Sequence, residues 1–485
     1  MQETILVLSS NVVLSGLIAR TLRYRRIYCM PIPLQTKATD LLVINPRGII
    51  IALPEGDADL LTQLDLGILT SGIPIFALGS AAISLCEHFG GTIDDILRSN
   101  AAVNLELSSD PLFDQINSGE RVLRSLCALS LPADLVALAK ASNDVIGFKH
   151  VTLPIYALQY SIERNDPDSA QLLFNFAHGI CMANTNWDED LVIDTAVDQI
   201  RSISGNGRVI CAISGGLDSA VCAKLASLAV SDRLVCLFVD TGLLRLDEAQ
   251  SVIDSYRDIM GIEVEYIDAK DSFLHALAGV TSASDKKRIT SSLMTQLLLK
   301  YVQEEEQTPT LVMGTNLNDT ISGFAQDNPI QKSKGDMQLN IYEPLLTVFK
   351  EEVVRIATTI GMPPSITQRK PFPLSGLALR ISGEVTQERL NVLRGAEACF
   401  MSEIRQGDFQ KRLWQYYTSL IEDPDHPKSY MICLRALQSA QGGKYAARLP
   451  FDLLERTTNR IRAEVPGISR VVYDLTPSTN IVDPE

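Results

Sequence analysis

The sequence predicts an α/β protein built mainly on parallel β-sheets. Short apolar runs, such as GIIIAL (48–53) and IPIFAL (73–78), are typical of strands buried on both faces of a sheet, and helical patterns separate them. The same alternation begins again with RVICAI (208–213) and RLVCLFVD (233–240). A chain of 485 residues has room for about three domains.

The first segment alternates strand and helix signals as far as a polar stretch at 183–192 (ANTNWDEDLV). We therefore expect an α/β domain over residues 1–186. In chain order, its signals are a strand at 5–8, a helix at 14–25, strands at 27–32, 48–53 and 73–78, an extended stretch at 150–160 and a helix at 167–183.

Two further domains are expected, over residues 187–372 and 373–485. The first of these has the alternation of a second parallel sheet, whereas the last combines extended stretches and helices as a small α+β unit does. Their signals are strands at 208–213, 233–240, 264–268 and 310–314, helices at 286–304, 386–405 and 450–464, and extended stretches at 429–437 and 469–475.

The composition is that of an ordinary globular protein, with 46% hydrophobic and 21% charged residues. Acidic residues (58) outnumber basic ones (43), and the net charge of −15 argues against a broad basic surface for nucleic acid. No apolar run approaches the roughly 18 residues of a membrane span, so we expect no membrane partner. Nine scattered cysteines without a CxxC pair argue against a disulfide framework or a zinc ribbon, and reduced thiols indicate a cytoplasmic protein.

The strongest local signal is ISGGLDSAV (213–221), which lies between a predicted strand and a predicted helix. Its two glycines let backbone N–H groups approach an anion, and the helix N-terminus adds partial positive charge. Ser214 and Ser219 offer hydroxyl donors, and Asp218 is suited to hold a Mg²⁺ that bridges two phosphates. An ordinary glycine turn with a helix cap is the alternative, but the strand–loop–helix context favours phosphate binding. The loop is not a Walker motif, because GxxxxGK[ST] is absent.

This loop and several later stretches resemble known families. SGGLDS (214–219) resembles the pyrophosphate loop, SGGxDS, of the N-type ATP pyrophosphatases. From about Arg208 to Thr476 the chain is identified as a member of the glutamine-hydrolysing GMP synthetase family. The matching stretches are FVDTGLLRLDEAQ (238–250), EPLLTVFKEEVVRIA (343–357), the RKPFP and GLALR portions of 369–380, GEVT (383–386) and RLPFDLLERTTNRIRAEVPGISRVVYDLT (448–476).

The resemblance implies a fold and an activity. The fold is a class I amidotransferase-like α/β domain, an adenine nucleotide α-hydrolase-like parallel-sheet domain and a small α+β dimerisation domain. In the family, ATP adenylates the C2 oxygen of xanthosine 5′-monophosphate, and ammonia then displaces AMP. We therefore expect an ATP-dependent, AMP-forming carbon–nitrogen ligase with ATP and Mg²⁺ as cofactors, acting as a homodimer.

The family's site residues, carried over by position, predict which residues of this chain are catalytic and which bind the nucleotide. Asp218 and Lys350 would be catalytic, Asp218 as the metal ligand and Lys350 as a cation that neutralises phosphate charge. The loop would cradle the β- and γ-phosphates, and the ends of two strands would line the adenosine. The expected nucleotide-binding residues are Ser214, Gly215, Gly216, Leu217, Ser219, Val239, Gly314, Thr315 and Asp319.

The first domain resembles a class I glutamine amidotransferase that has lost its catalytic residues. The family's cysteine nucleophile aligns with Gly79 and its histidine base with Ser161, while the acid persists as Glu163. The family's glycine-rich oxyanion strand aligns with 52–54 (ALP). We therefore expect no glutaminase activity, a domain kept as a scaffold or interaction surface, and a ligase that takes free ammonia or another nucleophile.

The synthetase part departs from the family on the acceptor side. The loop at 332–336 is shortened, and the family's C-terminal KPPxTIEWE, whose lysine meets the nucleotide phosphate, is replaced by 477–485 (PSTNIVDPE), which has no Lys or Arg. We therefore expect a purine-like acceptor other than xanthosine 5′-monophosphate, without the 5′-phosphate or with that group held differently. If the acceptor is unchanged, Arg380 or Arg470 would have to hold the phosphate.

Three alternatives stay open. The activated carbonyl could receive sulfur, although Cys211 and Cys222 beside the loop lie in apolar runs that favour core packing, as does Cys236. The chain could be a non-catalytic nucleotide-binding homologue. It could also make GMP from free ammonia, because a lost glutaminase does not forbid that reaction.

Overall fold

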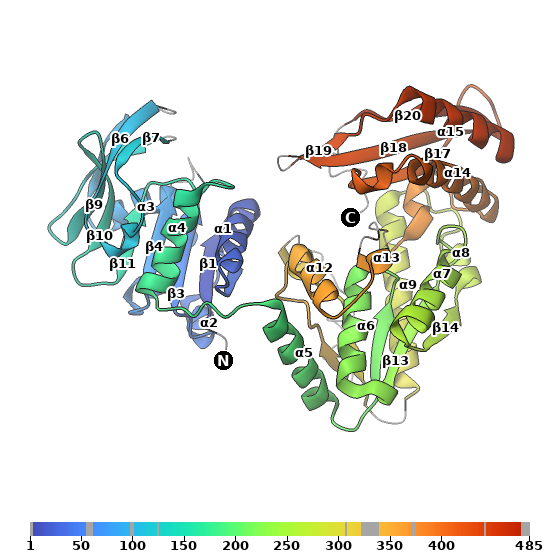
Figure 1. Ribbon diagram of the computed structural model, residues 1–485, viewed down its shortest axis with the longest axis horizontal. Helices are drawn as coiled ribbons and strands as arrows, with labels where there is room; N and C mark the ends of the chain where they lie inside the picture. Colours follow the sequence, from blue (N-terminus) through green and yellow to red (C-terminus); the bar gives the residue numbers. More distant parts are fainter. Residues whose placement is uncertain are drawn as a thin grey trace. The chain divides into compact units, whose positions relative to one another are not determined.

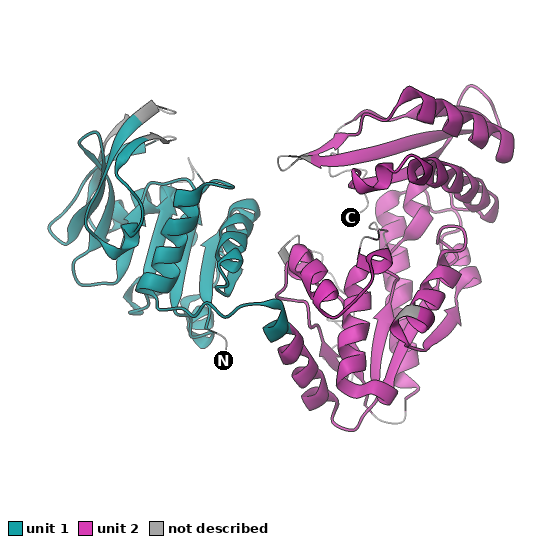
Figure 2. Cartoon of the chain, in the orientation of Figure 1, with its two compact units in different colours: residues 1–192 teal, residues 193–485 magenta. Residues whose placement is uncertain are grey.

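The computed structural model describes residues 3–54, 62–97, 101–123, 126–305, 308–321, 339–367, 369, 372, 374–440 and 443–476. The chain forms two compact units, residues 1–192 and 193–485, which we call unit 1 and unit 2 (Figure 2). In the described part of the chain, no helix is both long enough and apolar enough to cross a membrane.

Unit 1 is built on a sheet that is parallel in one half and antiparallel in the other. Six consecutive buried residues in β3 explain why the parallel strands appear as unbroken apolar runs. The order across the sheet is β2 (Cys29–Pro33), β1 (Ile5–Ser9), β3 (Gly48–Leu53), β4 (Ile75–Gly79), β11 (Ile155–Leu158), β10 (Asp144–His150), β9 (Leu135–Ala141), β6 (Ala101–Leu107) and β7 (Gly119–Leu123), with antiparallel pairing from β10 onward.

The helices of unit 1 pack on the parallel half of this sheet. Helix α1 (Val12–Tyr24) lies against β1 and β2 and beside α4 (Pro167–Phe174), as Figure 1 shows, and α3 (Ser80–His88) follows β4 directly. A short helix, α2 (Ala38–Val43), precedes β3, and a π-helical turn (Asn175–Ile180) continues α4. These elements agree with the expected strand and helix signals of the first domain.

Residues 92–150 contain strands that the sequence did not predict. They form antiparallel strands, β6, β7, β9 and β10 of the main sheet and a separate pair, β5 (Thr92–Leu97) with β8 (Leu126–Ser130). Strand β9 (LVALAKA) mixes buried and exposed positions without strict alternation. Such a half-buried strand carries a weak sequence signal, which explains the miss.

Unit 2 begins with a fully parallel five-stranded sheet. Its order is β14 (Val264–Asp268), β13 (Leu234–Asp240), β12 (Val209–Ile213), β15 (Thr310–Val312) and β16 (Asn340–Tyr342). The helices that precede, connect or follow these strands are α5 (Glu189–Ser204), α6 (Leu217–Val230), α7 (Glu248–Asp254), α8 (Lys270–Ala276), α9 (Ala283–Gln303), α10 (Leu317–Ile321), α12 (Lys350–Thr359) and α13 (Pro364–Thr367).

The C-terminal part of unit 2 is a small mixed sheet, antiparallel except for the parallel pair of β18 and β20, with two helices (Figure 1). It contains a 3₁₀ turn at Gly376–Arg380, α14 (Gln387–Gln406), β17 (Gln415–Glu422), β18 (Tyr430–Ala440), β19 (Gly443–Ala446), α15 (Phe451–Glu464) and β20 (Ile468–Tyr473). One cluster of buried apolar side chains runs from Ile210 and Leu237 through Leu377 to Leu393 and Ile432. The two parts of unit 2 therefore share a core, and a domain boundary at 372 stays a prediction.

Candidate active site

The predicted phosphate loop lies where β12 ends and α6 begins, at the carboxyl edge of the parallel sheet. Gly215 has a φ of +75°, and a Cβ there would lie 2.5 Å from Val252 Cγ2, so only glycine fits without strain. Gly216 is the N-cap of α6 and provides no capping side chain. The first N–H groups of the helix are thereby left to a ligand.

Two serines hold the loop in shape. The Ser219 hydroxyl accepts the Ser214 N–H at 3.2 Å and donates to the Gly216 carbonyl at 3.1 Å. The Ser214 hydroxyl accepts the Gly216 N–H at 3.3 Å and lies 3.2 Å from that of Ser219. Both predicted serines therefore brace the backbone that would face a phosphate.

Asp218 and Lys350 meet although 132 residues separate them. Lys350 Nζ lies 2.5 Å from Asp218 Oδ2, and the Lys350 N–H donates to Asn318 Oδ1 at 3.0 Å. The other carboxylate oxygen, Asp218 Oδ1, is buried and has no hydrogen-bond partner among the described residues. A buried, unpartnered carboxylate oxygen is costly in water-free surroundings and suits a cation or a ligand donor.

The other predicted nucleotide-binding residues lie on β13 or in the segment that follows β15, the two strands that flank β12. Gly314 follows β15 and packs on the loop so closely that a Cβ would lie 2.9 Å from the Ser219 nitrogen. Val239 is a buried residue of β13. The Thr315 hydroxyl donates to the Glu343 carboxylate, and Asp319 Oδ2 accepts the Asn316 N–H at 3.0 Å. Gly314 is thus brought to the loop, whereas the side chains of Thr315 and Asp319 hold the turn that follows it.

The sequence analysis assigned no role to Arg369, which the structure places beside the loop. Its Nη1 atom lies 3.0 Å from the position that a Cβ of Gly215 would occupy. The RKPFP stretch marked this arginine as part of a matching segment. Arg369 and Gly215 are 154 positions apart in the sequence, so no local pattern predicts their contact.

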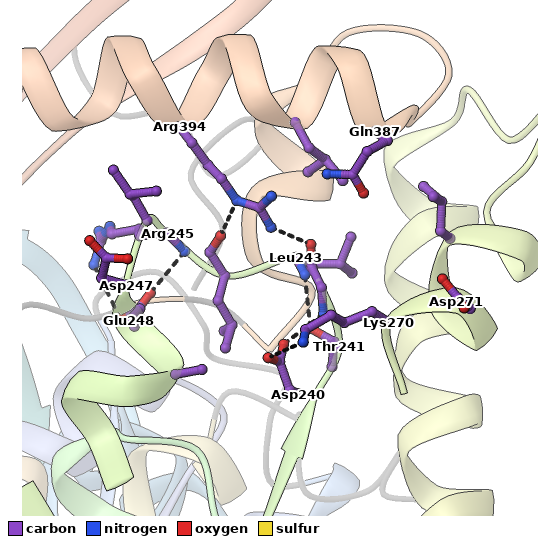
Figure 3. A pocket seen from close by; sticks show the side chains of 16 residues that line it. Asp240, Thr241, Leu243, Arg245, Asp247, Glu248, Lys270, Asp271, Gln387 and Arg394 are labelled. Carbon is purple, nitrogen blue, oxygen red and sulfur yellow. Dashed lines mark hydrogen bonds and ion pairs between the residues drawn. The ribbon is translucent and has the colours of Figure 1, made fainter. Parts of the chain in front are cut away.

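A pocket of about 250 Å³ lies after the carboxyl end of β13, lined by the following loop and by residues of α7, α8 and α14 (Figure 3). Its two central cations are engaged by protein groups. Arg394 donates to the carbonyls of Leu244 (2.8 Å) and Gly242 (2.5 Å), and Lys270 pairs with Asp240 at 3.4 Å. These bonds fix the loop after β13 against α14.

The positions aligned with the amidotransferase nucleophile and base, Gly79 and Ser161, come at and after the ends of two adjacent parallel strands, β4 and β11. Gly79 pairs with Leu53 of β3, and the segment leading to Ser161 leaves β11 beside β4. Gly79 has φ +65° and ψ −131°, a sharp turn from strand to helix of the kind that presents a nucleophile. A Cβ at Gly79 would lie 2.5 Å from the Leu53 carbonyl oxygen. The Glu163 N–H donates to Ser169 Oγ at 3.2 Å.

No group of three or more His, Cys, Asp or Glu side chains within the described ranges could hold a metal ion by itself. All nine cysteines are described, and none is in a disulfide. Cys211, Cys222 and Cys236 are fully buried, as expected. Burial raises the pKa of Cys222 well above its ordinary value, and a hydrogen bond to Cys236 together with burial does the same for Cys211.

Comparisons with known proteins show which family the chain resembles. Residues 192–384 match the family model described as NAD synthase, and residues 402–480 match that of the GMP synthase C terminal domain. A "GMP synthase [glutamine-hydrolyzing]" of Caldanaerobacter subterraneus subsp. tengcongensis is 31% identical over 500 residues, covering 98% of this chain and 97% of its own. One from Dehalococcoides mccartyi (strain CBDB1) is 31% identical over 518 residues, covering 99% and 95%.

The chain belongs to the GMP synthase family. The predicted family and α/β fold class are confirmed, and the chain is an ATP-dependent, AMP-forming ligase. The crystal structure of a putative GMP synthase protein from Thermoplasma acidophilum is similar at 21% identity over 38% of this chain and 95% of its own, with a TM-score of 0.33.

Proposed function

We propose that this ligase uses ATP to adenylate a carbonyl oxygen of a purine-like acceptor and then admits free ammonia, releasing AMP and pyrophosphate. The observation that carries the proposal is the loop at 214–219, which joins an open helix N-terminus to the Asp218–Lys350 pair. The acceptor oxygen attacks the α-phosphorus of ATP, and pyrophosphate leaves with the electrons of the bond. Ammonia then attacks the activated carbon, and AMP departs.

The loop would hold the β- and γ-phosphates through its backbone N–H groups, from Ser214 to Ser219 and including Leu217. Lys350 would neutralise charge that grows on the departing pyrophosphate. The adenosine would lie between the ends of β13 and β15, against Val239 and the Gly314-Thr315 turn, which Asp319 supports. The side chains would act by position and charge, because this chemistry needs no protein nucleophile.

Asp218 would hold Mg²⁺ through its buried, unpartnered Oδ1 atom. A single carboxylate fits this ion, since Mg²⁺ in phosphoryl-transfer sites is held by one or two carboxylates together with the substrate phosphates. When bound, the ion would supply positive charge to the phosphate oxygens. Asp218 would then be shared between the cation and Lys350.

Unit 1 would take no part in producing ammonia. At Gly79 the nucleophile is missing, and the Leu53 carbonyl occupies the space where its Cβ would stand. The ligase would therefore depend on free ammonia. The buried, protonated thiols beside the loop offer no sulfur nucleophile, so they do not favour the sulfur-transfer alternative.

The acceptor is proposed to differ from xanthosine 5′-monophosphate. The two segments that first suggested this, 332–336 and 477–485, lie outside the described residues. Arg380 has a side chain only 1% exposed and paired with Glu397 at 2.6 Å, so binding a phosphate would require breaking a buried ion pair. Arg470 pairs with Asp425 at 3.2 Å on the surface. Burial therefore weakens Arg380 as a substitute donor, and Arg470 is the exposed one of the two.

The test is AMP formation from ATP, Mg²⁺ and ammonium over a panel of oxopurine bases, nucleosides and nucleotides. We expect turnover with at least one member and weak or no turnover with xanthosine 5′-monophosphate. Rapid conversion of xanthosine 5′-monophosphate would contradict the altered acceptor. AMP formation with no member would contradict the ligase proposal and favour a nucleotide-binding homologue. Sedimentation of the same preparation tests the proposed homodimer, for which the match at residues 402–480 is the support.

A further inference from the structure

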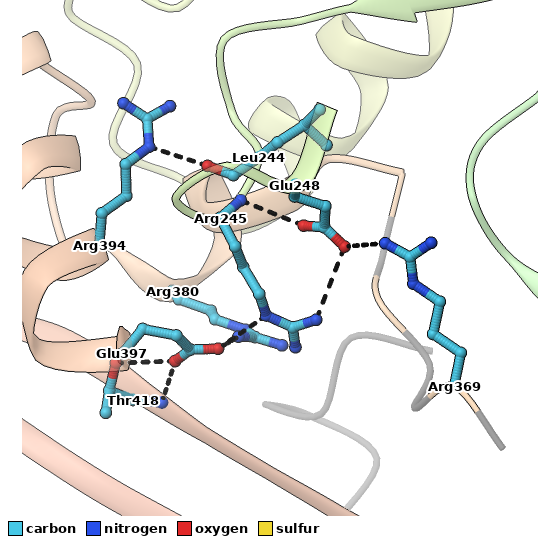
Figure 4. Close-up of polar contacts among 8 residues, drawn as sticks. All are labelled: Leu244, Arg245, Glu248, Arg369, Arg380, Arg394, Glu397 and Thr418. Carbon is cyan, nitrogen blue, oxygen red and sulfur yellow. Dashed lines mark hydrogen bonds and ion pairs between the residues drawn. The ribbon is translucent and has the colours of Figure 1, made fainter. Parts of the chain in front are cut away.

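Five charged side chains of unit 2 alternate in sign between the phosphate loop and β17 (Figure 4). We call them the charge chain: Arg369, Glu248, Arg245, Glu397 and Arg380. The joining distances are 2.9 Å from Arg369 Nη2 to Glu248 Oε1, 3.8 Å from Glu248 Oε1 to Arg245 Nη1, 3.0 Å from Arg245 Nε to Glu397 Oε1, and 2.6 Å from Glu397 Oε1 to Arg380 Nη1.

The inner end of the charge chain is fixed by burial. The side chains of Arg380 and Glu397 are 1% and 2% exposed. Glu397 Oε2 also accepts the N–H and the hydroxyl of Thr418 in β17, at 2.7 and 2.8 Å. Burial alone would raise the pKa of Glu397, but Arg380, Arg245 and Thr418 hold it below its ordinary value. A buried ionised carboxylate cannot give up a partner cheaply, so Arg245 is held in place.

The middle of the charge chain, Arg245 and Glu248, is also held in place and connects Glu397 to the loop. Arg245 also stacks on the Phe372 ring, with Cζ 4.2 Å from the ring centroid. Glu248 accepts the Arg245 N–H at 3.1 Å, which anchors its carboxylate at the start of α7. The carboxylate is therefore positioned from two sides before it meets Arg369.

The outer end of the charge chain faces the phosphate loop. The Arg369 side chain is 25% exposed, and one of its nitrogens, Nη2, binds Glu248. Its Nη1 lies against Gly215 and makes no hydrogen bond to any residue that the structure describes. Three arginines and two glutamates leave a surplus of one positive charge. Arg380 Nε and Nη2 also lack a hydrogen-bond partner among the described residues, but they are buried, whereas Arg369 Nη1 lies at the loop on a side chain that is 25% exposed.

We propose that Arg369 binds the β/γ-phosphate portion of ATP across the loop from Lys350, and that Glu248 is a positioning residue that aims it. The inference rests on the proposed function, and it names a second cation for the same site. When one nitrogen of a guanidinium is bound to a carboxylate, its remaining N–H groups can still donate to the oxygens of a phosphate. Because Glu397 is held by β17, the C-terminal part of unit 2 thereby sets the geometry of the phosphate site.

The experiment is titration calorimetry of the full chain with ATP·Mg²⁺ and, separately, with AMP. Arg369→Ala should weaken ATP binding by about 10²-fold, Arg369→Lys should recover part of the loss, and Glu248→Gln should weaken ATP binding by about tenfold. AMP binding should stay unchanged in all three, because AMP lacks the phosphates that Arg369 would contact. Arg257→Ala, which removes a surface arginine paired with Asp254 at 2.8 Å, is the matched control.

Each result decides something. Equal ATP affinity in wild type and Arg369→Ala would overturn the inference, as would a parallel loss of ATP and AMP binding, which marks a merely structural role. A normal Glu248→Gln beside a defective Arg369→Ala would overturn the positioning role of Glu248. If the wild-type chain bound neither nucleotide, the proposed function itself would fail, and that outcome is distinguishable from the others.

Discussion

In unit 1 the chain turns from β4 into α3 at Gly79, and in unit 2 it turns from β12 into α6 at Ser214–Gly216. Both turns lie at the carboxyl edge of parallel strands, and both use a glycine with positive φ, +65° at Gly79 and +75° at Gly215. The first resembles a nucleophile turn without its nucleophile. The second has the glycine turn, the two serines and the Asp218–Lys350 pair that we propose bind ATP.

The difference between the two turns shows that a nucleophile turn and a phosphate loop need different things from the backbone. A nucleophile turn needs one side chain, and at Gly79 a backbone carbonyl, that of Leu53, blocks its Cβ. A phosphate loop needs N–H groups, so glycine serves it directly. At Gly215 the neighbours of a Cβ are the side chains of Val252 and Arg369, and the latter adds charge.

The largest expected effect is on Asp218. Asp218→Ala removes the buried carboxylate oxygen and the partner of Lys350, so AMP formation should fall by at least about 10³-fold. The measurement is AMP release with the acceptor found in the panel, alongside circular dichroism to show that the variant folds. Retained AMP formation would remove the loop from the mechanism.

Lys350→Ala should have the next largest effect. It removes one preorganised charge from the pyrophosphate side, which corresponds to a loss of about 10²-fold in kcat. Lys411→Ala is a matched control, because Lys411 is a surface lysine that pairs with Asp408 at 3.2 Å. An equal loss in both variants would show that net charge, and not position, matters.

ATP should stabilise unit 2, but not unit 1, against thermal unfolding. If the units unfold in separate transitions, ATP·Mg²⁺ at 100 times its Kd should stabilise the transition of unit 2 by about 2.7 kcal/mol and leave that of unit 1 unchanged. Differential scanning calorimetry of the full chain measures both. Glutamine should shift neither transition, and stabilisation of unit 1 by glutamine would show that its binding site survives.

Gly79→Ala tests how firmly the vestigial turn excludes a side chain. The positive φ and the 2.5 Å approach to the Leu53 carbonyl should destabilise unit 1 by about 1–3 kcal/mol. Gly179→Ala is the control, because a Cβ there has no heavy atom within 4 Å. A near-neutral Gly79→Ala would mean that β3 and β4 move apart easily, and the site would then be one substitution from holding a nucleophile.

A smaller expected effect is a pH dependence of the free energy of unfolding of unit 2, caused by Lys286. Lys286 is buried with its ammonium on the carbonyls of Ala378 and Ile381, and burial lowers its pKa to about 8. Above pH 8 the unfolded chain therefore binds more protons than the folded one, so this residue makes the free energy of unfolding rise with pH, by up to about 1 kcal/mol per pH unit. Urea unfolding at pH 8 and 9 should show the rise in wild type relative to Lys286→Met. Equal slopes in the two proteins would contradict it.

The sequence predicted the parallel strands of both units except the three-residue β16, and it predicted the strand–turn–helix at 213–221, because these are local patterns: apolar runs, a glycine turn and a following helix. It also predicted Lys350 as a site residue, through the resemblance of the segment 343–357 to the family. It did not predict the antiparallel strands between 92 and 150, where burial depends on which partner strand is adjacent. Nor could it predict two contacts between distant segments. The Leu53 carbonyl lies over Gly79 because of the register of β3 and β4, and Arg369 lies beside Gly215 because of how the chain folds back after β16.

The comparison between the two turns is tested most directly by supplying nitrogen to the ligase in two forms. AMP release is measured with ATP, Mg²⁺ and the best acceptor of the panel, first with ammonium and then with glutamine as the nitrogen source, and glutamate is measured in parallel. We predict AMP release with ammonium, and neither AMP nor glutamate with ammonia-free glutamine. Glutamate formed in proportion to AMP would contradict this, because unit 1 would then be an active glutaminase.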